Sequence, residues 1–208
     1  MKHALLFLWT LPSLVASYQH YPPPQDPPIM RAWSCHGRSQ RELVNNLATA
    51  QIIRSPIVKK VMTLVDRANY VNQRPYDDTP QSIGWSQTIS APHMHAHALE
   101  LIVPAIEKSQ SPTMLDVGCG SGYLTAAMGR MVSDHHNKEP LVGDGSGKVY
   151  AVDVFPGLVE MTKENIMKQD ADLIQDGTVT VQLGDGWKGL PSAAPFDAIH
   201  VGAAADNF

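Results

Sequence analysis

Apolar residues at helical spacing follow two helix-start signals in the first third of the chain. Ser39 and Glu42 form a capping-box pair, which predicts a helix beginning near Gln40. Ser55 and Pro56 give a second start, because proline at the first helical position already has a helical φ. The apolar residues after each signal recur three or four positions apart, so each segment is expected to bury one face.

A polar stretch separates these two segments from a third predicted helix. Residues 74–90 are punctuated by Pro, Asp and Gly and are expected to form a loop. Apolar residues then repeat at helical spacing, which predicts a helix over about 92–108 with Ser90 or Ala91 as its N-cap. Pro104 is expected to kink this helix or end it early, because proline lacks the backbone donor.

The rest of the chain alternates short apolar runs with helical patterns. The expected strands are Met114–Val117, Val149–Val154, Val179–Leu183 and Ala198–Gly202. The expected helices are Gly122–Val132 and Pro156–Lys168. Strand–helix alternation predicts an α/β fold, with a doubly wound, mainly parallel, Rossmann-like sheet and helices on both faces.

The N-terminal residues do not fit this globular pattern. A basic start at Lys2, an apolar run and small residues at Ala16 and Ser17 are typical of a secretory signal peptide, and the run is too short to span a bilayer. A proline-rich stretch with no means of packing a core follows. We expect residues 1–29 to be a signal-peptide-like or non-core extension and residues 30–208 to be the folded domain.

The composition fits one domain and argues against a nucleic-acid partner. Of the 208 residues, 43% are hydrophobic, which is enough for one ordinary core. The formal net charge is −4 and no long Lys/Arg block occurs, so no nucleic-acid partner is expected. Cys35 and Cys119 have neither zinc-site nor disulfide-framework spacing. His93 and His97 lack a third ligand, so no metal site is expected.

The stretch MLDVGCGSGY predicts a ligand-binding turn. Gly118, Gly120 and Gly122 follow an expected strand and precede an expected helix, so backbone N–H groups are expected to face a ligand there. The spacing is G-x-G-x-G rather than the dinucleotide G-x-G-x-x-G, and Tyr123 occupies the third glycine's place. The carboxylate of Asp116 would repel a diphosphate but attract an ammonium group. The turn therefore favours a ligand with an amino-acid end.

Acidic residues also end the next two expected strands. Asp153 is expected to accept hydrogen bonds from ribose hydroxyls, with helix capping before Pro156 as its structural alternative. Asp185 could accept a hydrogen bond from an adenine amino group, and Gly186 would leave room for the ring. The Asp-Gly pair is also a common turn.

Together these features resemble a class I S-adenosylmethionine-dependent methyltransferase. The segments TISAPHMHAHALE over 88–100, PQSIG over 80–84 and APFDAIHVGAAA over 194–205 further resemble the protein-L-isoaspartate (D-aspartate) O-methyltransferase family. The resemblance runs from about residue 32 to residue 205.

The resemblance implies a role for each matching residue. Ser90 matches the active-site serine, with Thr88 and Ile89 beside it, and His95 matches a position close to the cofactor. The remaining cofactor-binding positions are the methionine-binding loop at Asp116, Gly118, Gly120, Ser121 and Gly122, the ribose-binding Asp153, and the adenine edge at Asp185 and Gly186.

The family's activity follows as an expectation. The resemblance implies S-adenosyl-L-methionine as cofactor and methylation of the free α-carboxylate of L-isoaspartyl and D-aspartyl residues in damaged proteins, which initiates their repair. Damaged proteins or peptides would then be the partners, without stable membrane association. The resemblance implies a cytoplasmic location, whereas the first 17 residues suggest the secretory route as the alternative.

Other interpretations remain open on the sequence alone. The family continues past IHVGAAA with further strands, so the chain is expected to be C-terminally incomplete and to leave the strand at Ala198–Gly202 as an open edge. The main alternative is therefore an inactive relative that acts at most as a cofactor- or peptide-binding module. A nucleotide-dependent oxidoreductase is disfavoured by the glycine spacing. A small-molecule or nucleic-acid methyltransferase is disfavoured by the signature over 88–95.

Overall fold

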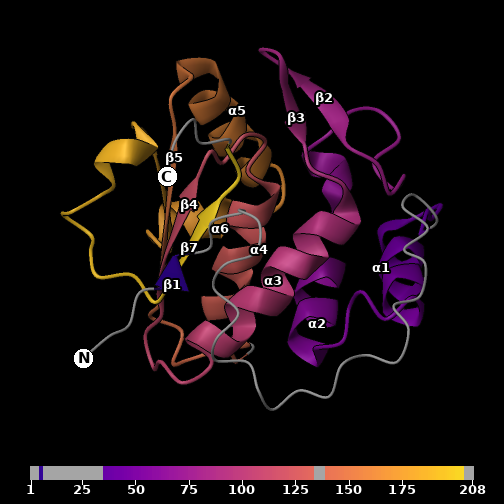
Figure 1. Ribbon diagram of the computed structural model, residues 1–208, viewed down its shortest axis with the longest axis horizontal. Helices are drawn as coiled ribbons and strands as arrows, with labels where there is room; N and C mark the ends of the chain where they lie inside the picture. The colour runs from indigo at the N-terminus through magenta and orange to yellow at the C-terminus, as the bar shows by residue number, and fades with distance from the viewer. Residues whose placement is uncertain (1–4, 7–34, 134–138, 204–208) are drawn as a thin grey trace, which may run out of the picture.

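The computed structural model describes residues 5–6, 35–133 and 139–203. Within these ranges a five-stranded parallel sheet has the order β1-β7-β4-β5-β6 (Figure 1). Its strands are β1 (Leu5–Leu6), β4 (Thr113–Val117), β5 (Lys148–Asp153), β6 (Val179–Leu183) and β7 (Ala198–Val201). The predicted mainly parallel α/β sheet is confirmed, and the four predicted strands shift by no more than one residue at either end.

Helices α1 (Gln40–Thr49) and α2 (Pro56–Leu64) begin at the serine caps that the sequence indicates. The other helices are α3 (Pro92–Ile106), α4 (Tyr123–Val132), α5 (Pro156–Met167) and α6 (Ala171–Gln175), with 3₁₀ helices η1 (Arg67–Asn69) and η2 (Gly186–Lys188). The Ser39 hydroxyl accepts a hydrogen bond from the Glu42 N–H at 3.3 Å. The capping box is only half formed, because the Glu42 carboxylate accepts from the Arg38 N–H instead.

Helix α3 begins at Pro92 as predicted and ends at Ile106, two residues before its predicted end. Its N-cap is Ala91, which offers no side-chain cap, so the hydroxyl of Ser90 is not used to start the helix. The helix continues through Pro104 and ends at Ile106. Because Pro104 lies in the last turn, its missing N–H removes one intrahelical bond without ending the helix.

The expected loop at 74–90 contains a β-hairpin, so that prediction was wrong. Strands β2 (Gln81–Gly84) and β3 (Gln87–Ile89) pair antiparallel. Tertiary contacts support these short strands: a Cβ on Gly157 would lie 2.4 Å from the Trp85 ring, so the hairpin tip packs directly on α5. The turn residues Trp85 and Ser86 both have positive φ, of 49° and 57°, which local sequence gives little reason to expect.

The two faces of the sheet are covered differently. The α-helices of the described residues share one apolar core with sheet residues such as Met114 and Val149. On the opposite face Leu115 and Val152 pack against Phe196. We expected helices on both faces, but among the described residues the segment 184–197 covers this second face and contains only η2. Its glycines and prolines are poor helix formers, which explains the difference.

The edge of the sheet at β7 is partly paired. Leu5 pairs with Ala198 and Leu6 with Ile199, so the first half of the predicted open edge has a neighbour. Apart from Leu5 and Leu6, the predicted extension over 1–29 lies outside the described residues. Among the described helices, none has the combination of length and hydrophobicity required to cross a bilayer.

Candidate active site

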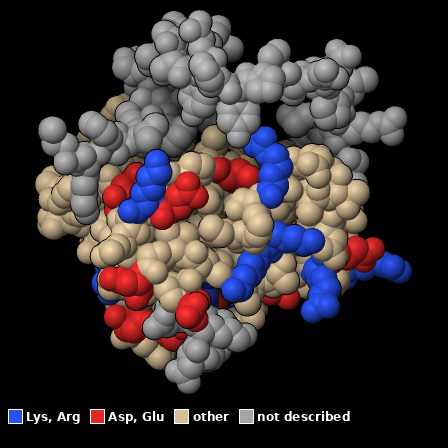
Figure 2. Space-filling model, turned by 90° about the horizontal axis from the view of Figure 1, so that it is seen from below, with Lys and Arg blue, Asp and Glu red and all other residues tan. Residues whose placement is uncertain are grey.

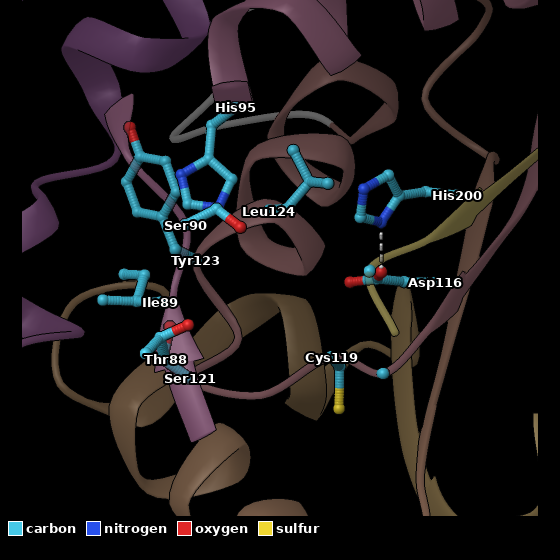
Figure 3. Close-up of a pocket in the computed structure, with 12 residues that line it drawn as sticks. Thr88, Ile89, Ser90, His95, Asp116, Cys119, Ser121, Tyr123, Leu124 and His200 are labelled. Carbon is cyan, nitrogen blue, oxygen red and sulfur yellow. Dashed lines mark hydrogen bonds and ion pairs between the residues drawn. The ribbon is translucent and has the colours of Figure 1, made fainter. Parts of the chain in front are cut away.

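The strand order reverses at β4, which has β5 and β6 on one side and β7 on the other. In open α/β sheets ligands bind at the carboxyl ends of the strands beside such a reversal. A pocket lies there, and Figure 3 shows Ser90 and His95 on one wall and Asp116 with His200 on the other. It is lined by Thr88, Ile89, Ser90, His95, Asp116, Gly118, Cys119, Ser121, Tyr123, Leu124, His200 and Gly202.

The pocket unites most, but not all, of the predicted residues. Gly120, Gly122, Asp153, Asp185 and Gly186 do not line it. Sequence reasoning had not assigned a site role to Cys119, Tyr123, Leu124, His200 or Gly202. Tyr123 and Leu124 could have been predicted to line the site, because they directly follow the glycine loop in the sequence. His200 of β7 and Gly202 just after it could not, because the pairing of β7 with β4 brings them to the pocket.

The loop between β4 and α4 is tied to its surroundings by hydrogen bonds. The N–H groups of Gly118, Gly120 and Gly122 donate to the Val152 carbonyl, the Asp153 carboxylate and the Cys119 carbonyl, at 2.8, 3.1 and 2.9 Å. The expectation that these amides face a ligand was therefore wrong. The loop is too tight to leave them free. The glycines instead contribute room and left-handed backbone, as at Gly122 with φ 87°.

Side chains of α5 hold the same loop from the other side. The Thr162 hydroxyl donates to the Gly120 carbonyl at 2.9 Å, and the Asn165 amide donates to the Ser121 carbonyl at 2.9 Å. Both polar side chains are buried. The conformation of the loop therefore depends on α5 as well as on its own glycines.

Asp116 is buried at the end of β4, and both of its oxygens are hydrogen-bonded. Oδ2 accepts from the Thr125 hydroxyl at 2.5 Å, and Oδ1 lies 2.8 Å from His200 Nδ1. His200 is the register partner of Asp116 on β7. His200 also lines the pocket.

Asp153 connects β5 to the glycine loop. Its oxygens accept from the N–H groups of Gly120 and Phe155, both at 3.1 Å. A carboxylate oxygen has more than one acceptor site, so Asp153 can still accept from a ligand hydroxyl. The capping alternative is met only in part, since Asp153 bonds the N-cap residue of α5 rather than a helical N–H.

Asp185 and Gly186 lie beyond β6 along the same edge of the sheet. The carboxylate of Asp185 caps η2 by accepting from the Trp187 N–H at 3.0 Å. A Cβ on Gly186 would lie 2.3 Å from Val117 Cγ1, so packing over the end of β4 requires glycine there. The Gly184 N–H donates to the Asp153 carbonyl at 3.0 Å, which brings this segment beside the end of β5.

A buried arginine supports the Ser90 side of the pocket. Arg67 is 0% exposed, and its Nη2 donates to the Ser90 carbonyl at 2.8 Å. Its Nη1 lies 3.2 Å from His95 Nδ1, and its guanidinium carbon lies 5.6 Å from the centre of the Tyr123 ring. Nothing in the sequence around Arg67 predicted this placement.

Burial shifts the pKa values of these groups. Desolvation lowers the pKa of Arg67 to about 10, so the guanidinium stays charged at neutral pH. The pKa of His95 is lowered well below its ordinary value, mainly by burial and then by the charge of Arg67. Burial raises the pKa of Tyr123 to about 12. At neutral pH the Ser90 side of the pocket therefore holds one fixed cation and a neutral imidazole.

The neutral His95 predicts a pH-dependent stability. The unfolded chain protonates His95 below about pH 6.5, and the folded chain does not. The contribution of His95 to the free energy of unfolding is therefore complete above that pH. It is lost as the pH falls, by up to about 1.4 kcal/mol per pH unit. Urea unfolding measures the free energy of unfolding at several pH values between neutral pH and pH 5. We expect this free energy to fall with pH in the wild type, and to fall less steeply in His95→Gln because the contribution of the histidine is absent. Equal slopes for both proteins would contradict the prediction.

The cysteine in the loop is not a reactive thiol. Burial, and then the charge of Asp116, raises the pKa of Cys119 to about 12. Its Sγ lies 3.4 Å from the Thr162 hydroxyl. A thiol that stays protonated is a poor nucleophile. Among the described residues no group of three or more His, Cys, Asp or Glu side chains could hold a metal ion.

The fold and the site define the class of the protein. A parallel sheet with reversal at β4, a glycine loop tied to an acidic residue at the end of β5, and a pocket beside them are features of Rossmann-like, S-adenosylmethionine-dependent methyltransferases. The structure has a TM-score of 0.71 and 31% sequence identity to a Plasmodium falciparum protein-L-isoaspartate O-methyltransferase in complex with S-adenosyl-L-homocysteine. That match covers 83% of this chain and 77% of the other.

Comparison of sequences identifies the family. The family model described as protein-L-isoaspartate(D-aspartate) O-methyltransferase matches residues 38–208, and the chain belongs to this family. A Caenorhabditis elegans protein-L-isoaspartate O-methyltransferase is 38% identical over 174 residues, which cover 84% of this chain and 72% of that protein. Protein-L-isoaspartate O-methyltransferase 2 of Arabidopsis thaliana is 42% identical over 173 residues, which cover 81% of this chain and 51% of that protein. The chain thus spans between about half and three quarters of these relatives.

Proposed function

We propose that this protein transfers a methyl group from S-adenosyl-L-methionine to the free α-carboxylate of L-isoaspartyl and D-aspartyl residues in damaged proteins, as the first step of their repair. The observation that carries the proposal is the meeting of Ser90 and the glycine loop at one pocket. The N-terminal half of the chain supplies Ser90 through β3 and the sheet supplies Asp116. Family membership supports the same activity.

The residues around the pocket fit the cofactor. Gly118 has φ 80°, and a Cβ there would lie 3.1 Å from Ala203, so only glycine keeps this part of the loop open. Asp116 offers a negative charge for an ammonium group, and Asp153 retains acceptor sites for ribose hydroxyls. Asp185 and Gly186 would border the adenine. When bound, the cofactor supplies a methyl group activated by the adjacent sulfonium.

The protein's part in the reaction is positioning rather than proton transfer. A substrate carboxylate has a pKa near ~4 and is already ionised at neutral pH, so no general base is needed. The Ser90 hydroxyl, which α3 does not use as a cap, would hydrogen-bond and orient that carboxylate. The Cys119 thiol stays protonated and does not compete as a nucleophile.

A methyl-transfer assay with paired peptides tests the proposal. We expect the wild type to methylate an isoaspartyl peptide and not the same peptide with normal aspartate. Ser90→Ala should lower kcat/KM by ~10- to 100-fold, because a hydrogen bond to a charged group contributes about 1.5–3 kcal/mol. Affinity for S-adenosylhomocysteine should be unchanged.

The matched control is Ser192→Ala, an exposed serine outside the pocket, which should behave as the wild type. Saturable cofactor binding without methyl transfer to the isoaspartyl peptide would contradict the activity and favour an inactive, cofactor-binding relative.

A nucleic-acid substrate is disfavoured by the charge distribution. Figure 2 shows both Lys or Arg and Asp or Glu side chains on the face drawn, so neither sign of charge covers that face alone. The formal net charge is −4. We propose damaged proteins or peptides as the partners and a cytoplasmic location, and a mature N-terminus near Tyr18 would contradict that location.

A further inference from the structure

A carboxylate from outside the helix caps the first turn of α3. Pro92 has no N–H, and the two N–H groups that follow His93 donate to the Ala91 carbonyl at 3.0 and 3.2 Å. Within this turn, all of which the structure describes, the His93 N–H is the donor that the helix itself does not satisfy. It donates instead to Asp78 Oδ1 at 2.9 Å.

Asp78 is held firmly in this position. Its side chain is buried, and its Oδ1 also lies 2.8 Å from His93 Nδ1. Because a carboxylate only accepts hydrogen bonds, the imidazole must donate this second bond. The backbone N–H of Asp78 donates to His36 Nδ1 at 3.0 Å. The segment before β2 is therefore tied to the start of α3, where a negative charge is also favoured by the helix dipole.

Ser90 is the other side chain that could cap this helix. A serine at an N-cap accepts a hydrogen bond from the N–H three residues later, and Ser90 stands three residues before His93. If α3 began one residue earlier, the Ser90 hydroxyl would take the N–H that Asp78 now holds. In the structure the N-cap is Ala91, and Ser90 lines the pocket. The two side chains are thus alternative acceptors for one donor.

The charge of Asp78 makes it the stronger acceptor. A hydrogen bond to a charged group contributes more than one between neutral groups. Asp78 also acts on Arg67, whose Nη2 donates to the Ser90 carbonyl at 2.8 Å. Burial lowers the pKa of Arg67 to about 10, and the charges of Tyr123 and Asp78 oppose that shift. The carboxylate therefore supports the Ser90 side of the pocket both through α3 and through Arg67.

We propose that Asp78 is a positioning residue: by capping α3 in place of Ser90, it leaves the Ser90 hydroxyl available to the ligands of the pocket. Asp78 does not line the pocket itself, so it acts through Ser90 rather than by touching substrate or cofactor. The consequence for turnover rests on the proposed function, whereas the consequence for the helix does not.

A stability cycle by urea unfolding tests the exchange of caps without any need for activity. In the wild type, Ser90→Ala should change the folding equilibrium constant less than about twofold, because the hydroxyl is not a cap. In the Asp78→Ala background Ser90 becomes the cap. Ser90→Ala should then lower the constant about 2- to 30-fold, the usual effect of losing a cap. The same small effect in both backgrounds would overturn the proposal.

The kinetic cycle measures the consequence for the reaction. Asp78→Ala should lower kcat/KM for the isoaspartyl peptide at least ~10-fold. Ser90→Ala should then lower it less than about threefold further, because the hydroxyl is already diverted to the helix. Fully additive losses would show that Asp78 does not act through Ser90. A wild type without methyl transfer would contradict the proposed function, and the stability cycle would still test the exchange of caps.

Asp78→Asn is the conservative variant. It keeps an oxygen that accepts both bonds from His93, so Ser90→Ala should have its wild-type effects on stability and on kcat/KM in this background. The variant keeps the proposal testable if Asp78→Ala does not fold. A cap-sized loss of stability from Ser90→Ala in the Asn background would overturn the proposal.

Ser55→Ala is the control for the loss of a cap elsewhere. The Ser55 hydroxyl caps α2 by accepting from the Ile57 N–H at 3.2 Å, away from the pocket. Its removal should lower the folding equilibrium constant by a factor in the same range and leave kcat/KM unchanged. A loss of kcat/KM as large as that in Asp78→Ala would show that reduced stability alone explains the effect, and would overturn the positioning role.

Discussion

Arg130→Met is expected to lower the free energy of unfolding by about 3–5 kcal/mol, the usual cost of breaking a buried ion pair by removing one partner. Arg130 is buried in α4, and its Nε donates to Asp170 at 2.7 Å while its two Nη atoms reach Asp172 at 2.5 Å. Asp170 is also buried and receives only the Tyr70 hydroxyl, at 3.0 Å, as a further side-chain donor. Without Arg130, the negative charge of Asp170 would be buried and would lack its ion-pair partner.

Urea denaturation at pH 7 gives the measurement, with two comparison variants. Lys163→Met breaks the exposed Lys163–Glu160 pair and should cost less than about 1 kcal/mol. Adding Asp170→Asn to Arg130→Met removes the stranded charge but keeps an acceptor for Tyr70, and should recover part of the lost stability. A double variant no more stable than Arg130→Met would contradict the stranded-charge explanation.

Gly122→Ala is expected to weaken S-adenosylhomocysteine binding at least ~100-fold, a loss of about 3 kcal/mol. Gly122 has φ 87°, and a Cβ there would lie 2.8 Å from Thr162 Cγ2. The left-handed backbone alone costs a non-glycine residue roughly 1–2 kcal/mol. The clash also displaces Thr162, whose hydroxyl holds the Gly120 carbonyl, so the loop beneath the pocket moves.

Gly177→Ala is the matched control for this loop. Gly177 has a similar φ of 71°, but no atom lies within 4 Å of the position that its Cβ would occupy. It should lose stability from backbone strain alone and bind S-adenosylhomocysteine as tightly as the wild type. Titration calorimetry on both folded variants makes the comparison. If Gly122→Ala bound S-adenosylhomocysteine as tightly as the wild type, the loop would tolerate displacement and the prediction would be wrong.

Local patterns predicted the elements that carry their own signals. Ser39 and Ser55 marked two helix starts correctly, because capping depends on the next two or three residues only. The parallel strands were recognised from apolar runs between helices, since strands buried on both faces are apolar throughout. The glycine loop and Asp153 were assigned to the same ligand because each lies at the end of a predicted strand, and the carboxyl ends of parallel strands meet at one edge.

The features that the sequence did not reveal depend on contacts between distant segments. The β2–β3 hairpin forms inside a punctuated stretch, and Trp85 at its tip packs against Gly157 of α5, more than 70 residues along the chain. The loop amides turn inward because Val152 and Asp153 accept their hydrogen bonds. The site role of His200 comes from the β4–β7 pairing that brings it to Asp116.

The sequence by itself determined the four main parallel strands to within one residue, the starts of α1 and α2 and, through the signature at 88–95, the family. Only the tertiary structure decided which polar groups are already satisfied and which still face the pocket. Arg67 shows the reason: its burial, its lowered pKa and its contacts with Ser90 and His95 arise from the packing of η1 beneath α3. Nothing in the neighbouring residues encodes that arrangement locally.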